Sequence, residues 1–62
     1  MPPRFVEMLE LLADGLNLNE IAEQRGVNVA SVKNDAKQMR DSLGADSNCQ
    51  AVAMAIRRQI IA

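Results

Sequence analysis

The sequence predicts an all-α domain of four short helices, a tetrahelical helix-turn-helix fold. The chain has 62 residues, which is enough for one small core. Its apolar residues are Ala, Val, Ile, Leu and Met with a single Phe, a composition that favours close-packed helices over strands. Three apolar stretches of helical period are each followed by a glycine, the usual residue at a helix C-terminus. We therefore expect one domain over residues 1–62.

The first helix is expected over residues 3–14. Pro2 and Pro3 suit a first helical turn, where a missing N–H costs nothing. The apolar residues that recur at i, i+3, i+4 and i+7 are Phe5, Met8, Leu9 and Leu12. Gly15 is expected to end this helix in a left-handed conformation.

The second helix and the turn after it form the helix-turn-helix pattern. Asn17 and Glu20 have the spacing of a capping box, which predicts a short helix that ends at residue 24 or 25. Gly26 follows, and Asn28 is a second N-cap. Two short helices joined by a glycine-containing turn of three or four residues are typical of DNA-binding helix-turn-helix proteins.

The third helix is expected over residues 29–43, with Gly44 as its stop. Its predicted inward stripe is Val32, Ala36, Met39 and Leu43. The opposite, solvent-facing side carries Lys33, Asn34, Lys37, Arg40 and Asp41. This pattern predicts a polar, mostly basic face.

The fourth helix is expected over residues 48–58. Ser47 and Gln50 have the spacing of another capping box. Its apolar positions Val52, Ala55 and Ile56 are expected to dock on the core. Cys49 and Ala53 lie on a neighbouring face that could meet a partner.

The charge is unevenly distributed, although the net charge is only −1. Residues 1–27 hold two Arg against five acids, whereas residues 28–62 hold five cations against three acids. A nucleic-acid-binding protein usually has a surplus of basic residues, so the net charge does not by itself predict nucleic-acid binding. A basic second half is compatible with DNA binding.

The missing residue types predict what the chain does not do. It has no His and only one Cys, so neither a conventional zinc site nor a Ser–His–Asp triad can be built. We expect no metal, no cofactor and no enzymatic activity. Cys49 is expected to be a small apolar residue rather than a redox sensor. No apolar run approaches the roughly 20 residues of a membrane span, and the N-terminus lacks a signal-peptide stretch, so a cytoplasmic protein without membrane contact is expected.

The order of these features resembles the DNA-binding domain of LuxR/FixJ-type, or GerE-like, transcriptional regulators. The match can be laid over all 62 residues without a gap. Each motif alone is weak, but their joint spacing is specific. The segments that carry it are 6–16 (VEMLELLADGL), 19–23 (NEIAE), 26–27 (GV), 31–34 (SVKN), 43–44 (LG) and 51–53 (AVA).

This resemblance implies a third helix in the DNA major groove and a fourth helix that forms a homodimer. The family's base and nearby phosphate contacts map onto Lys33, Asn34 and Lys37, while Asn28 and Ser31 match backbone-contacting positions. Arg40 is added as a DNA-binding candidate, although it could equally pair with an acid on the surface. The candidate dimerisation residues are Cys49, Val52, Ala53 and Ile56.

The chemistry of these side chains is consistent with that role. Asn pairs bidentately with adenine, and Lys donates to guanine acceptors. The alternative interpretation is an ordinary solvated helix face. Asn28 is expected to be an N-cap first and a phosphate contact second, since helix N-termini attract phosphate.

The sequence also departs from the family pattern. Asp35 stands where the family often has His or another neutral or basic residue, Asp41 and Ser42 replace residues that are frequently basic, and the helix-one opening is reduced to Pro3-Arg4-Phe5. An acid beside phosphates opposes binding to a polyanion. These departures predict DNA affinity that is weak or that depends on dimerisation or a partner.

A sequence-specific regulator of transcription, bound to double-stranded DNA, is thus the first hypothesis. The second is a protein-binding module or anti-activator that heterodimerises with a larger regulator and has weak or no DNA binding. RNA polymerase is a further possible partner. Region four of a sigma factor shares the turn motif, but the extra helix after Gly44 argues against it.

Overall fold

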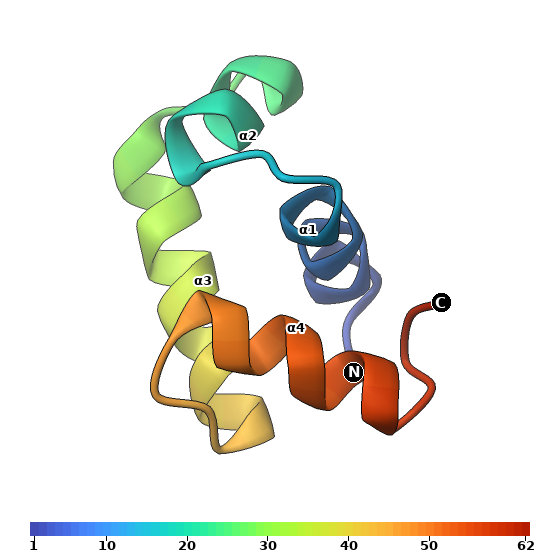
Figure 1. Ribbon diagram of the computed structural model, residues 1–62. Coiled ribbons are helices and arrows are strands. Elements are labelled where there is room, and N and C mark those ends of the chain that lie inside the picture. The colour runs from blue at the N-terminus through green and yellow to red at the C-terminus, as the bar shows by residue number, and fades with distance from the viewer.

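The computed structural model describes residues 1–62 and contains helices only. They are α1 (Pro3–Ala13), α2 (Leu18–Arg25), α3 (Val29–Leu43) and α4 (Asn48–Arg57), shown in Figure 1. The predicted all-α, four-helix architecture is confirmed. The first and fourth helices each end one residue earlier than expected, with Asp14 and Arg58 as their C-caps.

The N-termini of α2 and α3 are capped as predicted. In the capping box of α2, the Glu20 N–H donates to Asn17 Oδ1 at 2.8 Å, and the Asn17 N–H donates to Glu20 Oε1 at 2.9 Å. In α3, Asn28 Oδ1 accepts from the N–H groups of Ala30 and Ser31. Both caps satisfy donors that the first helical turn leaves without a partner.

The predicted capping box of α4 is only half formed. Ser47 Oγ accepts from the Gln50 N–H at 3.1 Å, but Gln50 Oε1 accepts from the Asp46 N–H at 2.7 Å, not from that of Ser47. The Ser47 backbone is more extended than that of Asn17 (φ −144° against −88°), which turns its N–H away from the first turn. The side chain at the third helical position therefore caps one residue earlier in the chain.

All four helices end in the same hydrogen-bonded turn, with one residue in the left-handed conformation. In the first three this residue is a glycine, as predicted: Gly15, Gly26 and Gly44. In α4 it is Gln59, with φ of 59°. The Ile60 N–H donates to the Ala55 carbonyl at 2.8 Å and the Gln59 N–H to the Ile56 carbonyl at 3.0 Å, the bond pattern of a Schellman motif.

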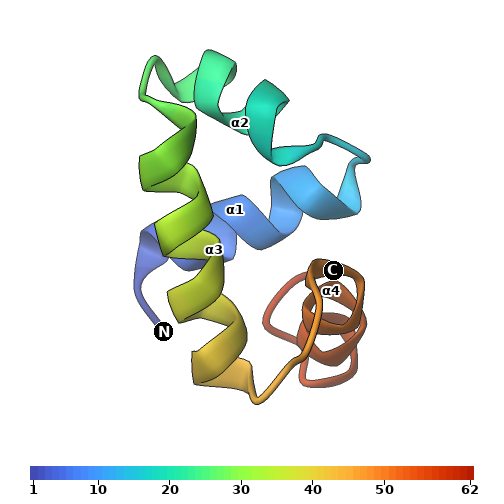
Figure 2. The same ribbon diagram turned by 90° about the vertical axis from the view of Figure 1, so that its left-hand side faces the viewer.

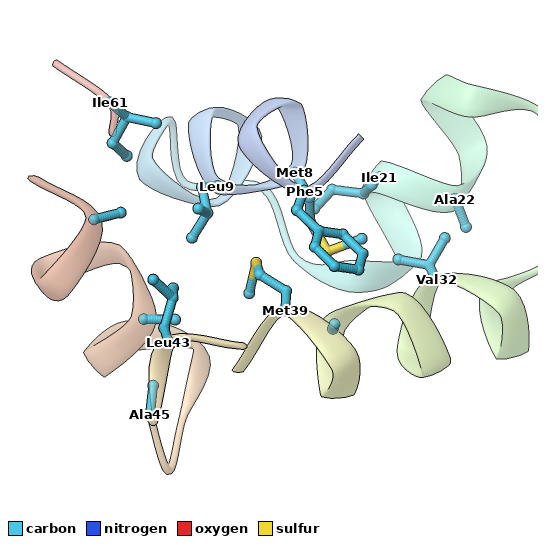
Figure 3. Packing of buried hydrophobic residues seen from close by; sticks show 13 residues of the cluster. Phe5, Met8, Leu9, Ile21, Ala22, Val32, Met39, Leu43, Ala45 and Ile61 are labelled. Atoms are coloured by element: carbon cyan, nitrogen blue, oxygen red, sulfur yellow. The ribbon is translucent and has the colours of Figure 1, made fainter. Parts of the chain in front are cut away.

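The core lies between α1 and α3. These two helices contact each other and both remaining helices, whereas α2 and α4 do not contact one another. Figure 2 shows α2 and α4 at opposite ends of α3. In Figure 3, Phe5, Met8 and Leu9 of α1 lie opposite Val32 and Met39 of α3. The predicted inward stripe of α3 is fully confirmed, since Val32, Ala36, Met39 and Leu43 are all buried.

The packing of α4 differs from the prediction. Ala51 and Ala55 are buried, Val52 is half-buried, and Ile56 is 47% exposed, so Ile56 does not dock on the core. Two alanines four residues apart let α4 approach α1 and α3 closely, since neither has atoms beyond Cβ. Ile56 lies about 100° further round the helix and therefore points away from the core.

The last residues fold back onto the domain, which the sequence did not predict. After the left-handed turn at Gln59, Ile61 is buried at 8% exposure and Ile60 is half-buried against the core. Figure 1 shows this segment returning beside α1. None of the helices combines the length and apolar character needed to cross a lipid bilayer.

Candidate nucleic-acid interface

The polar face of α3 is open to solvent. Lys33, Asn34 and Lys37 are exposed, and none of their side chains makes a hydrogen bond or ion pair within the chain. The opposite side of α3 is the buried stripe that packs on the core, and this packing fixes the orientation of the helix. The polar face therefore points to solvent without needing contacts of its own. Side chains without an internal partner are available to a ligand.

The start of α3 lies beside this face. Asn28 and Ser31 are both exposed. Asn28 uses its Oδ1 as the helix cap, while its Nδ2 donates to nothing within the chain. The capping role of Asn28 is therefore confirmed, and its amide nitrogen remains available to an acceptor such as a phosphate oxygen.

Arg40 is held differently from the lysines. Its guanidinium donates to Asn48 Oδ1 at 2.7 Å, and the side chain is half-buried. Arg40 therefore lies on the flank of α3 that meets α4. Among the DNA-binding candidates, it is the one whose side chain is bonded to a residue of another helix.

Asp35 lies on the other flank of α3. It stands two residues from both Lys33 and Lys37, so at about 100° per residue it points roughly 160° away from each. Its carboxylate is 27% exposed and lies 3.9 Å from Nε of Arg4, at the start of α1. Asp41, in contrast, is exposed.

Two further arginines, Arg4 and Arg25, lie near the site but were not predicted from the sequence to belong to it. The Arg25 guanidinium, at the end of α2, donates to the Arg4 carbonyl at 3.0 Å. The Arg4 guanidinium lies 4.9 Å from the centroid of the Phe5 ring. The hydrogen bond joins residues 21 positions apart in the chain, so no local spacing indicated it.

The candidate dimerisation residues lie on one side of α4. Cys49 and Ile56 are exposed, whereas Val52 and Ala53 are half-buried. Cys49 and Val52 also line an open groove of about 400 Å³ between α4 and the end of α1. Its other lining residues are Leu12, Ala13, Gly15, Leu16 and Asn48. The structure thus leaves apolar surface uncovered at this end of the molecule.

Comparison with known proteins identifies the family. Neither the curated proteins nor the solved structures give a significant match. The family described as bacterial regulatory proteins, luxR family (GerE), matches residues 2–55, which include α1, α2, α3 and most of α4. A match over most of the chain confirms the resemblance and the helix-turn-helix assignment. The chain therefore belongs to the luxR family of bacterial regulatory proteins, as a DNA-binding helix-turn-helix domain.

Proposed function

We propose that this domain regulates transcription in the cytoplasm by placing α3 in the major groove of double-stranded DNA and reading base edges there. The observation that carries the proposal is the exposed, unpartnered set Lys33, Asn34 and Lys37 on the side of α3 opposite the core. An α-helix fits the major groove, where each base pair presents a distinct set of donors and acceptors. Asn28 and Ser31, at the helix start, contact the DNA backbone.

Dimerisation through α4 completes the proposal. Cys49, Val52, Ala53 and Ile56 provide the contact, and Ile56 is the largest apolar side chain exposed on this helix. Because α4 contacts α3 but not α2, a partner on the exposed side of α4 would leave α2 uncovered. A two-fold dimer would present two copies of α3 to two half-sites about one DNA turn apart, or a multiple of it.

Selection from a pool of randomised duplexes at low salt tests this function. A short palindromic site is expected among the bound sequences, with a spacing that reports on the dimer. Lys33 and Lys37 replaced together by Ala should abolish binding while the thermal unfolding curve stays unchanged. The matched control is Arg57→Ala with Arg58→Ala, which removes the same charge from the end of α4. Binding that survives the double lysine change would show that the proposed face is wrong.

The second candidate function is a protein-binding module that heterodimerises with a larger regulator through α4 or contacts RNA polymerase. Two observations favour it. The acids of α1 and α2 are exposed, namely Glu7, Glu10, Glu20 and Glu23, as is Asp14, and the apolar groove beside Cys49 is uncovered. Absence of DNA binding even at low salt, together with a complex formed with a purified luxR-family regulator, would favour this alternative.

A further inference from the structure

The flank of α3 that faces the start of α1 carries two arginines outside the face already described. Arg4 reaches this flank from α1 and Arg25 from the end of α2, where the two are joined by the hydrogen bond from the Arg25 guanidinium to the Arg4 carbonyl. Figure 2 shows the N-terminal end of α1 on one side of α3 and α4 on the other. Arg4 pairs with Asp35 on that side of α3, away from α4, and Arg25 is bonded to the backbone of Arg4.

A helix in the major groove has a phosphate backbone along each flank. The groove is about 12 Å wide, and a helix with its side chains is about 10–12 Å in diameter. When α3 is inserted, Asp35 faces one of these flanks, since it points roughly 160° away from Lys33 and Lys37. An acid alone on that flank would repel its phosphates, but here Arg4 lies beside it, with its Nε 3.9 Å from the carboxylate. Arg25 is bonded in turn to the Arg4 carbonyl.

The contacts of both arginines leave them free to bind an anion. The Arg4 side chain is 57% exposed, and its 3.9 Å separation from Asp35 is at the limit of an ion pair. Ion pairs of this exposed kind are weak, whereas an Arg guanidinium binds phosphate bidentately and with charge assistance. Arg25 uses one nitrogen on the Arg4 carbonyl, which leaves other N–H groups of its guanidinium.

We infer that Arg4 and Arg25 form a second phosphate-binding edge of the interface, and that Asp35 tunes it by competing with phosphate for Arg4. The inference rests on the proposed function, because it assumes that α3 lies in the groove. Asp35 is then a positioning residue that acts through Arg4. It is not itself a contact to DNA.

The salt dependence of DNA binding tests the phosphate edge. The chain is titrated into a fluorescent duplex carrying the selected site, and into one of unrelated sequence, at several salt concentrations. Arg4→Gln and Arg25→Gln should each weaken binding to both duplexes and reduce the slope of log K against log salt by about 0.9 per bound chain. Arg25→Lys keeps the charge and should keep the slope. Arg58→Gln, on α4, is the matched control and should change neither.

The role of Asp35 is tested by Asp35→Asn in two backgrounds. The substitution should strengthen binding severalfold in the otherwise unchanged chain, and much less when Arg4 is already Gln. An equal gain in DNA affinity in both backgrounds would contradict the proposal that Asp35 competes with phosphate for Arg4. Asp35 would then act on DNA directly.

The outcomes separate this inference from the proposed function. If the unchanged chain binds DNA but the glutamine variants keep its salt slope, α3 reads DNA without the second edge, and the inference is wrong. A loss of thermal stability with an unchanged slope would mean that the arginines only join α1 and α2. If the unchanged chain does not bind DNA at low salt, the proposed function fails and the inference fails with it.

Discussion

The Arg40 guanidinium donates a hydrogen bond of 2.7 Å to Asn48 Oδ1, joining the last turn of α3 to the first residue of α4. The bond spans the connection from Gly44 to Ser47. It therefore helps to set the angle between the helix with the basic face and the helix proposed to form the dimer. Arg40 therefore has a structural role in the free domain, independent of any contact with DNA.

We expect Arg40→Ala and Asn48→Ala each to lower the free energy of unfolding by about 1 kcal/mol, the net contribution of a typical hydrogen bond. Because the two side chains share one bond, the double variant should lose little more than either single one. Chemical denaturation of the four proteins in this cycle measures the coupling. Strict additivity would show that the bond does not stabilise the fold.

Gln59 occupies the left-handed position at the end of α4 that glycine occupies in the other helices. A residue with a Cβ is strained there by about 1–2 kcal/mol. Gln59→Gly should therefore raise the free energy of unfolding by about 1 kcal/mol, allowing for the greater freedom of glycine in the unfolded chain. Thermal and urea unfolding measure the change.

The matched control is Gln38→Gly, at an exposed position inside α3. There the backbone is already helical, and glycine should lower the free energy of unfolding by about 1 kcal/mol. Opposite signs for the two substitutions are expected. A Gln59→Gly variant that is less stable than the unchanged chain would contradict the claim that Gln59 is strained at this turn.

Ile61 and Ile56 are the same residue type in opposite environments, 8% and 47% exposed. Ile61→Ala should lower the free energy of unfolding by about 2 kcal/mol or more, as buried Ile-to-Ala changes do. Ile56→Ala should change it by no more than about 0.5 kcal/mol in the monomer. Equal losses would mean that the last residues do not pack on the core in solution.

Asn34 is expected to determine specificity rather than affinity alone. If its side chain pairs with one adenine, Asn34→Ala should remove about 1–3 kcal/mol of discrimination at a single base-pair position. Competition binding between the selected site and its single-base variants measures this loss. Gln24→Ala, at an exposed position of α2, should leave the discrimination at every base-pair position unchanged. A uniform loss of affinity across all sequences would instead indicate that Asn34 contacts the DNA backbone.

Much of the fold and of the candidate site could be predicted because it depends on local pattern. A capping side chain reaches only two or three residues along the chain, so Asn17, Asn28 and Ser47 could be assigned without knowledge of the packing. Gln59 escaped prediction because its turn has the geometry of a glycine turn without the glycine. The half-formed capping box at Gln50 shows that the N-cap can be predicted correctly while the second hydrogen bond of the box is not. Whether that second bond forms depends on the backbone angles of the N-cap residue.

The sequence by itself determined which side of α3 is buried and which is basic, because the helical repeat places Val32 and Met39 opposite Asn34. Tertiary structure decided which side chains meet across helices. The pairing of Asp35 with Arg4, the capture of Arg40 by Asn48 and the exposure of Ile56 all follow from how the helices cross. Crossing angles arise from the fit of two whole surfaces. A single helix can therefore show which face it presents, but not which neighbour that face meets.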